Sequence, residues 1–223
     1  MNGNLVITIQ PELIFSLVIM SAIVIFAIVA GRKVAAADPT QPPSGIVVVC
    51  ETLVNALYGF FKSILPANFE PWVYPYFAVL AIYILISNLS GLIGFDAPTS
   101  NFSITFSMAL VTFALIQFTA FKRKGAFKYV KELVWPPTNI LSAAAPLISL
   151  SMRLFGNILS GSIIMALVYS LLGWISSAII PFNFLGPVVA PVLHAYFDVF
   201  ASLIQTFIFV TLSSVYIALE YEG

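Results

Sequence analysis

The sequence predicts an all-α polytopic membrane protein with five transmembrane helices, of which the last two are long and tilted, plus one amphipathic interfacial helix. The first observation behind this prediction is composition: 61% of the 223 residues are hydrophobic and 8% are charged, whereas soluble domains are about 45 to 50% apolar and about 25% charged. The second is that uncharged stretches of bilayer-crossing length recur along the chain. A soluble fold is all but excluded, and residues 1–223 are expected to form a single membrane domain.

Charge and cysteine content exclude several other classes. The formal net charge of zero gives no electrostatic footprint for nucleic acid. Cys50 is the single cysteine, and the chain has no cysteine and histidine spacing typical of a metal site. We therefore expect no nucleic-acid partner, no metal and no cofactor. No basic segment precedes the first apolar stretch, so this stretch is predicted to be a retained span rather than a cleaved signal peptide.

The first span is predicted over residues 13–31, because its uncharged residues are about enough to cross most of a ~30 Å hydrocarbon core. A proline-rich loop at 36–45 follows it. The next apolar segment, 46–65, is interrupted by Glu51 and Lys62, which share one helical face. We therefore expect an amphipathic helix that lies along the membrane surface or enters it partway.

Two further spans are predicted over residues 72–95 and 102–121. Both are uncharged stretches long enough to cross a bilayer, and Asp96 with the turn-like segment 98–101 separates them. A charged loop follows over residues 122–132.

The last two spans come from a long apolar stretch in which Arg153 is the one charged residue. This stretch is too long for a single crossing. Gly173 and the proline- and glycine-containing segment 181–187 are expected to break it. The sequence therefore predicts helices over residues 139–172 and 188–219.

Basic residues predict the orientation of the chain. In a five-span arrangement, Arg32, Lys33, Lys62 and the lysine-rich loop 122–131 all fall on one side, and short cytoplasmic loops carry the excess of lysine and arginine. We expect a multi-pass protein of the cell inner (plasma) membrane, with the N-terminus outside and the C-terminus in the cytoplasm.

Arg153 has the most unusual position in the chain. An arginine at the centre of a membrane helix costs about 2.5 to 3.5 kcal/mol, so its retention needs a reason. At 100° per residue, Ser142, Ser149, Arg153 and Asn157 lie in one stripe of an otherwise apolar helix.

The last helix carries a second polar stripe. His194, Asp198 and Gln205 fall within about 60° of arc. Two structural interpretations stand beside an ion path: Arg153 pairs with Asp198 in a buried salt bridge, or His194 and Asp198 form an internal pair. Intramembrane ionisable residues usually mark ion paths, which favours the functional interpretation.

Two separated motifs carry a family resemblance. The string SMRLFGN at 151–157, with Gly161 after it, and the string QTFIF at 205–209 closely resemble the a subunit of the membrane sector of F-type ATP synthases. Further matches in the same order begin at Asn88 and continue through residues 98–110 and 122–133. The resemblance covers roughly residues 70–220, and the N-terminal part matches by hydropathy alone. The arginine string alone would be weak evidence for the family. Its combination with the distant glutamine string is strong evidence.

The resemblance implies a non-catalytic stator subunit that couples proton or sodium flow, through two half-channels, to rotation of a c-subunit ring and so to ATP synthesis. Arg153 takes the place of the arginine that faces the ring carboxylates, and Gln205 that of the glutamine beside it. Asn157 and Asp198 match polar positions assigned to the half-channels.

Expected partners are the c ring, the b subunits of the peripheral stalk and membrane lipid, with no small-molecule substrate other than the translocated ion. Segment 46–65 and the first span are candidate contacts for the b subunits.

Two departures from the family pattern affect the expected half-channels. Many members carry glutamate or histidine directly after the glycine that Gly161 matches, where this chain has Ser162. Many also have carboxylates upstream of the arginine, at positions where this chain has Asn139, Ser142 and Ala143. We expect the outer half-channel to depend on His194 and Asp198, while the opposite half-channel has no assigned residues. The choice between protons and sodium stays open, and the family favours protons.

Two other function classes are alternatives. A stand-alone secondary transporter or channel would use Arg153 as an anion site, but it leaves Gln205 unexplained. In a membrane enzyme, His194 and Asp198 would be the residues most similar to an active site. No nucleophile, metal or phosphate-binding motif accompanies them in the sequence.

Overall fold

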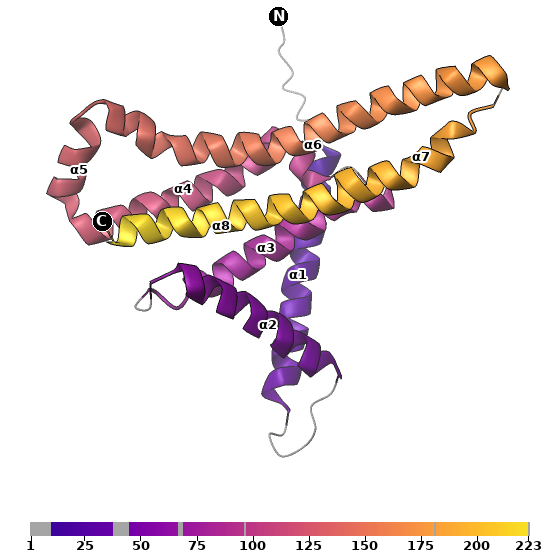
Figure 1. Cartoon of the computed structure of the whole chain (residues 1–223). Coiled ribbons are helices and arrows are strands. Elements are labelled where there is room, and N and C mark those ends of the chain that lie inside the picture. The colour runs from indigo at the N-terminus through magenta and orange to yellow at the C-terminus, as the bar shows by residue number, and fades with distance from the viewer. Residues whose placement is uncertain (1–9, 38–44, 67–68, 96, 181, 223) are drawn as a thin grey trace, which may run out of the picture.

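The computed structural model describes residues 10–37, 45–66, 69–95, 97–180 and 182–222. Every regular element in those ranges is helical, and six helical stretches are long and apolar enough to cross a membrane, so the predicted all-α polytopic membrane protein is confirmed (Figure 1). In chain order the elements are α1 (Pro11–Ala35), α2 (Gly45–Ile64), α3 (Val73–Leu89), η1 (Ser90–Ile93), η2 (Pro98–Ser100), α4 (Phe102–Lys124), α5 (Ala126–Val134), α6 (Thr138–Ile179), α7 (Leu185–His194), η3 (Ala195–Phe200) and α8 (Ala201–Glu222).

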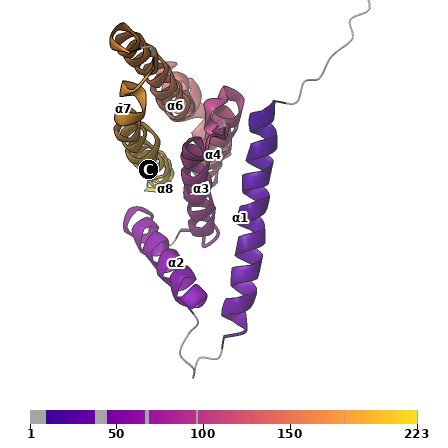
Figure 2. The same cartoon turned by 90° about the vertical axis from the view of Figure 1, so that its right-hand side faces the viewer.

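The N-terminal helix α1 lies along α3 and α4 on one side of the molecule (Figure 2). A hydrogen bond of 2.6 Å joins Ser16 Oγ to the hydroxyl of Tyr83 on α3. The stacked rings of Phe15 and Phe95, with centroids 4.7 Å apart, add a second contact. Most other side chains of α1 face outward, as expected of a helix at the edge of a membrane bundle.

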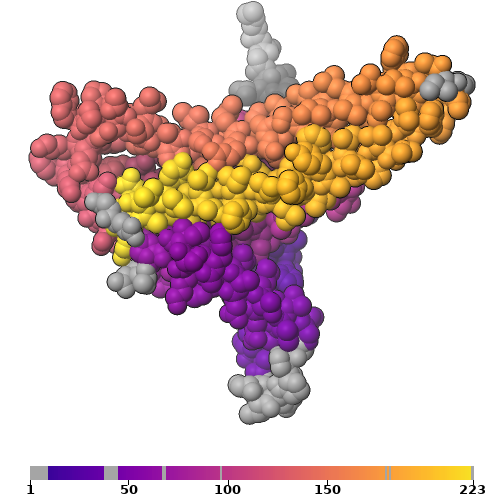
Figure 3. All heavy atoms as spheres, in the orientation of Figure 1, coloured from indigo at the N-terminus to yellow at the C-terminus, as the bar shows by residue number. Residues whose placement is uncertain are grey.

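Helix α2 is inclined beneath α8, and the two lie against each other in the space-filling view (Figures 2 and 3). Phe61 is buried at the interface with α3, and the ring of Phe60 lies 5.6 Å from that of Phe207 on α8. Glu51 and Lys62 are exposed. Apolar residues therefore occupy one face and charged residues another, as predicted, although α2 is also long and apolar enough to cross a membrane. Its interfacial placement stays a prediction.

The core lies between α3, α4, α6 and α8. Lipid is as apolar as leucine, so helices in a membrane associate through close van der Waals packing more than through the hydrophobic effect. Small hydroxyl residues serve that packing here: Ser151, Ser213 and Ser214 are almost fully buried and donate to carbonyls one turn earlier in their own helices. Around them the large buried side chains are Phe77, Ile84, Leu150, Leu154, Phe209 and Ile217.

Helix α6 is longer than predicted. It runs 42 residues to Ile179, so the expected end near residue 172 is wrong. Glycine is tolerated inside a long helix, and Gly173 lies beside the connecting turn, where a Cβ would be in ordinary contact at 3.5 Å from Nδ2 of Asn183. At 1.5 Å per residue α6 is about 63 Å long, about twice the hydrocarbon thickness, so it has to tilt strongly from the membrane normal. It crosses α1 at a large angle (Figure 1).

The turn between α6 and α7 is built on Asn183. Its Oδ1 accepts hydrogen bonds from the backbone N–H of Gly186 at 2.9 Å and from Ser176 Oγ at 3.3 Å. A Cβ on Gly186 would lie 2.9 Å from Nδ2 of Asn183, so a side chain there would displace the amide that holds this turn. The predicted break at 181–187 agrees with this turn. Pro181 itself, like Asp96 and residues 38–44 of the predicted first loop, lies outside the described residues.

The predicted final helix, 188–219, begins earlier and is not uniform. α7, η3 and α8 follow one another without interruption from Leu185 to Glu222, and η3 is a π-helical segment. Such segments are rare and occur frequently at functional sites. It contains Asp198, one of the predicted site residues.

Candidate ion-translocation site

Arg153 lies at the edge of the packed face of α6. Its neighbours Leu150 and Leu154 are fully buried, and its own side chain is half-buried. The guanidinium Nη2 donates to Ser149 Oγ, one turn earlier, at 3.0 Å. Within the described part of the chain no carboxylate lies within 4 Å of Arg153, so the buried Arg153–Asp198 salt bridge is not formed and that interpretation is wrong.

Arg153 and Gln205 lie at nearly the same height on neighbouring helices. α6 and the α7–η3–α8 stretch are antiparallel, and Gly161 on α6 faces Phe197 on η3, whose ring carbon would be 3.5 Å from a Cβ at that glycine. Arg153 comes eight residues before Gly161, and Gln205 eight residues after Phe197. Because the helices are antiparallel, eight residues backward on one and eight residues forward on the other cover the same distance in the same direction. The two side chains therefore lie within about one helical turn of each other in height.

Gln205 and Asn88 are buried amides with unused donors. Gln205 is 5% exposed and Asn88 is 3% exposed. Asn88 Oδ1 accepts from Thr99 Oγ1 at 2.6 Å. The amide nitrogens of both residues lack a hydrogen-bond partner within the described residues, and leaving a buried donor unsatisfied costs about 1 to 3 kcal/mol.

The two amides lie on α3 and α8, which pack against each other. The ring of Phe69, just before α3, lies 4.9 Å from that of Tyr221 at the end of α8, so the two helices are antiparallel. Counting from that contact puts Asn88, at the end of α3, level with the first turn of α8 and within about one turn of Gln205. The hydroxyls of Ser87 and Ser202 belong to the same region and are also without a partner among the described residues.

His194 links the two long helices. Its Nδ1 is hydrogen-bonded to Asp198 Oδ2, so the interpretation of His194 and Asp198 as an internal pair is confirmed. On the other side of the ring, Nε2 lies 2.8 Å from the hydroxyl of Tyr169 on α6. Tyr169, His194 and Asp198 thus form a continuous hydrogen-bonded chain. All three side chains are partly exposed.

Tyr169 is not among the residues predicted from the sequence. A signal was available, because Tyr169 and His194 lie at comparable distances along the chain before and after the turn at Asn183. Residues placed symmetrically about a helical hairpin turn meet across it. Polar side chains at such positions in an apolar hairpin therefore indicate an interhelical hydrogen bond.

The other two predicted residues have local roles. Asn157 is half-buried one turn after Arg153, and its carbonyl accepts from Ser160 Oγ at 3.1 Å. Ser162 is exposed, and its hydroxyl donates to the carbonyl of Leu159 in the same helix at 2.9 Å. The structure therefore does not join Ser162 to the Tyr169–His194–Asp198 chain by a hydrogen bond.

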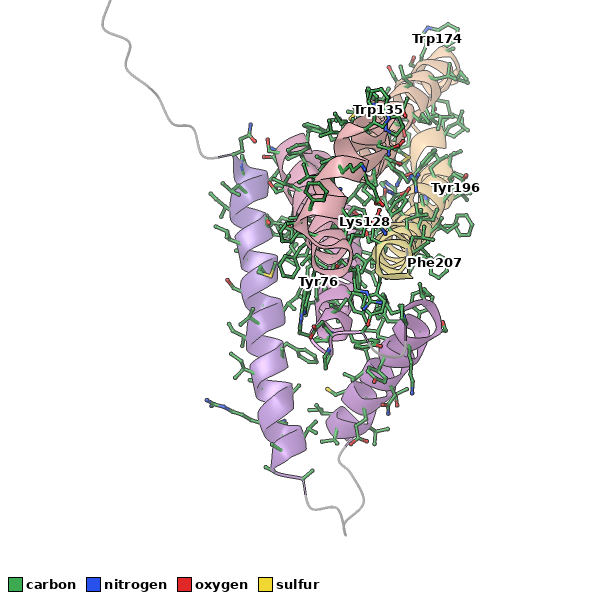
Figure 4. The ribbon with its side chains drawn as sticks, turned by 90° about the vertical axis from the view of Figure 1, so that its left-hand side faces the viewer. Tyr76, Lys128, Trp135, Trp174, Tyr196 and Phe207 are labelled. Atoms are coloured by element: carbon green, nitrogen blue, oxygen red, sulfur yellow. The ribbon has the colours of Figure 1, made fainter. Side chains whose placement is uncertain are left out.

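The outer faces of α6, α7 and α8 are apolar and uncovered. Large side chains there are more than half exposed, and Trp174, Tyr196 and Phe207 project outward from the two long helices (Figure 4). In the part of the chain that is described, no group of three or more histidine, cysteine, aspartate or glutamate side chains could hold a metal ion.

Comparison with known proteins gives one consistent result. The family model described as ATP synthase A chain matches residues 13–218. Among curated relatives, a protein of Mycoplasmoides gallisepticum named ATP synthase subunit a is 33% identical over 220 residues, covering 89% of this chain and 74% of its own length.

Two other bacteria supply relatives of the same name. The Legionella pneumophila protein is 32% identical over 182 residues, which cover 79% of this chain and 73% of that protein. The Helicobacter hepaticus protein is 33% identical over 185 residues, which cover 78% of this chain and 76% of that protein.

Proposed function

The chain belongs to the ATP synthase A chain family, and we propose that it is the ion-translocating stator of the membrane sector, in which Arg153 couples ion flow to rotation of the c ring. It is a non-catalytic membrane subunit, so the ATP chemistry lies on other subunits. The observation that carries the proposal is a half-buried arginine with no carboxylate beside it among the described residues, bonded to Ser149 alone.

Such an arginine acts on any carboxylate that approaches it. A cation within about 4 to 6 Å lowers a carboxyl pKa by about 1 to 3 units, which is worth about 1.4 to 4 kcal/mol. A ring carboxylate that reaches Arg153 therefore releases its ion. The membrane potential supplies about 2.3 kcal/mol per charge per 100 mV, which is comparable. Arginine does not deprotonate in proteins, so Arg153 also blocks a proton relay from one half-channel to the other.

Gln205 and Asn88 offer neutral polar groups close to the same height. Because both side chains are buried, their free amide donors can bond water that enters the protein beside Arg153, without adding a charge that would bind the ion permanently. This supports a role for Gln205 as a neutral polar group at the height of Arg153.

The Tyr169–His194–Asp198 chain supports an outer half-channel for protons. The tautomer of His194 that donates from Nδ1 to Asp198 accepts at Nε2 from the Tyr169 hydroxyl. A proton arrives at Nε2 of His194 from the Tyr169 side, and the Nδ1 proton then leaves toward Asp198. Together these two transfers move one proton along the helix and leave the imidazole of His194 with no net change in charge. We infer protons as the ion, with sodium as the alternative.

The uncovered apolar faces of α6 and of α7–η3–α8 support docking of the c ring. A stripe that carries an arginine has to be covered by protein or water rather than lipid. α1, on the far side of α3 and α4 from the two long helices, and α2, beneath α8, are the proposed contacts for the b subunits (Figure 2). The proposed orientation has the N-terminus outside and the C-terminus in the cytoplasm. Family membership argues against a stand-alone transporter or channel.

The test is ion uptake by proteoliposomes containing the whole complex with Arg153→Ala, run with protons and with sodium. Arg32→Ala on exposed α1 is the matched control. We expect the Arg153 variant to assemble, to lose ATP-driven transport and to retain or increase passive leak. Normal coupled transport would make Arg153 a structural charge and overturn the proposal.

A further inference from the structure

A polar cavity lies at the end of the molecule where α5 joins α4 to α6, beside the C-terminal end of α8 (Figure 1). Its volume is about 210 Å³, enough for several water molecules. Side chains from all four helices line it, including Gln117, Lys124, Glu132, Ser142 and Glu220. By the proposed orientation this is the cytoplasmic end of the protein.

Two carboxylates in the cavity share one ammonium group. Lys124 Nζ lies 2.9 Å from Glu220 Oε2 and 3.6 Å from Glu132 Oε2, while Lys128 Nζ lies 3.7 Å from Glu132 Oε1. The side chains of Glu132 and Glu220 are 45% and 37% exposed. Both carboxylates are therefore within reach of water while a cation holds them in place.

Neutral polar groups continue the cavity wall along α4 and α6. Tyr129 donates to Gln117 Oε1 at 2.6 Å, and Gln117 Nε2 donates to the carbonyl of Ala143 at 3.3 Å. Burial, reinforced by the nearby Glu220, raises the pKa of Tyr129, so this hydroxyl stays protonated and keeps donating. Asn139 Nδ2 donates to the carbonyl of Glu132 at 2.8 Å, which fixes α5 against the start of α6.

Ser142 leads from this cavity toward Arg153. It lies on the same stripe of α6 as Ser149, which bonds the guanidinium. Eleven residues separate Ser142 from Arg153, or about 16 Å along the helix. The positions on α6 that lack the carboxylates expected from the family pattern, Asn139, Ser142 and Ala143, all line this cavity.

We propose that this cavity is the cytoplasmic access path to Arg153, and that Glu132 from α5 and Glu220 from α8 supply the proton-exchanging carboxylates that α6 lacks. The inference rests on the proposed function. A proton released by a ring carboxylate beside Arg153 passes through water to the carboxylate of Glu220 or Glu132, which becomes a neutral acid and then loses that proton to cytoplasmic water. During ATP-driven pumping the same steps run in reverse. Lys124 stays charged throughout.

The test combines accessibility with transport in inverted membrane vesicles, which expose the cytoplasmic face of the whole complex. In a Cys50→Ser background, Ser142→Cys is treated with a positively charged thiosulfonate, which reacts with thiolates in water. Leu141→Cys is the matched control, because it is adjacent and 72% exposed but does not line the cavity. We expect the reagent to modify the Ser142 variant and stop its ATP-driven proton pumping, and to leave the Leu141 variant pumping.

Carboxylate variants give the second measurement. The double variant that combines Glu132→Gln and Glu220→Gln keeps side-chain size and removes both proton acceptors. Proton pumping should therefore fall severalfold in the assembled complex. Glu70→Gln is the control, since Glu70 also pairs with a lysine, Lys122, but lines a different cavity. If the double variant does not assemble, the Ser142 labelling decides.

Absence of labelling at Ser142→Cys, or wild-type pumping by the double variant, would overturn this access path. The stator role would survive that result if Arg153→Ala still abolished coupled transport. Normal transport by Arg153→Ala would instead remove the proposed function itself.

Discussion

The hydroxyl of Tyr169 on α6 lies 2.8 Å from Nε2 of His194 on α7, so a hydrogen bond joins the two long C-terminal helices near the turn that connects them. His194 in turn bonds Asp198 across the start of the π-helical segment. Three residues from two helices therefore present one uninterrupted path of ionisable and hydroxyl groups in an otherwise apolar hairpin. Four predictions follow from this geometry and from the positions of Gln205 and Gly161.

Tyr169→Phe should slow proton transport while leaving the fold unchanged. The substitution removes one hydroxyl and keeps the ring, so His194 loses its interhelical partner and the proton path is interrupted at one link. We expect ATP-driven proton pumping by the reconstituted complex to fall severalfold. Tyr58→Phe, on exposed α2, is the matched control. Equal rates for the two variants would show that Tyr169 has a packing role only.

Asp198→Asn should cut translocation by about tenfold or more, because positioned proton donors and acceptors contribute about 10²- to 10⁴-fold to proton-transfer steps. The amide keeps the size of the side chain and can still accept from His194, so the complex should assemble. The measurement is proton pumping normalised to assembled complex. Ser162→Ala, which removes a hydroxyl bonded within its own helix, should pump normally. Unchanged pumping by the Asp198 variant would refute its role in the outer half-channel.

Gln205→Met should separate function from stability. Gln205 Nε2 has no partner among the described residues, so an apolar side chain of similar size removes an unsatisfied donor and should leave the thermal stability equal or higher. Coupled transport should fall, because the neutral donor at the height of Arg153 is gone. The checks are thermal unfolding in detergent and ATP-driven uptake. A clear loss of stability with normal uptake would assign Gln205 to structure.

Gly161→Leu should disturb the spacing of α6 and the last helix. A Cβ at Gly161 would lie 3.5 Å from the Phe197 ring, an ordinary contact, so Gly161→Ala should be tolerated. The larger side chain overpacks the interface, which costs about 1 to 3 kcal/mol. We expect a lower melting temperature and loss of coupling for leucine, measured against Gly59→Leu on α2, where open space surrounds the glycine. Normal stability of the Gly161 variant would contradict the helix register that brings Arg153 and Gln205 to the same height.

The sequence by itself determined the membrane class and most of the helices. Hydropathy over about 20 residues is a local property set by the ~30 Å hydrocarbon thickness, so it can be evaluated without knowing the fold. The 100° periodicity likewise placed Arg153, Ser149 and Asn157 on one stripe. The predicted end of α6 at a glycine is wrong, since Gly173 lies inside the helix and does not end it.

Only the tertiary structure decided which polar groups meet. Arg153 has no carboxylate partner among the described residues, and His194 forms a hydrogen bond with Tyr169. Glu132 and Glu220 come from other helices to the part of α6 that has no acid of its own. These relationships depend on the register between helices. The turn at Asn183 and contacts such as that of Gly161 with Phe197 determine this register over long stretches of chain. A shift of one residue moves a side chain by 100° around its helix, and no local pattern in the sequence fixes that shift.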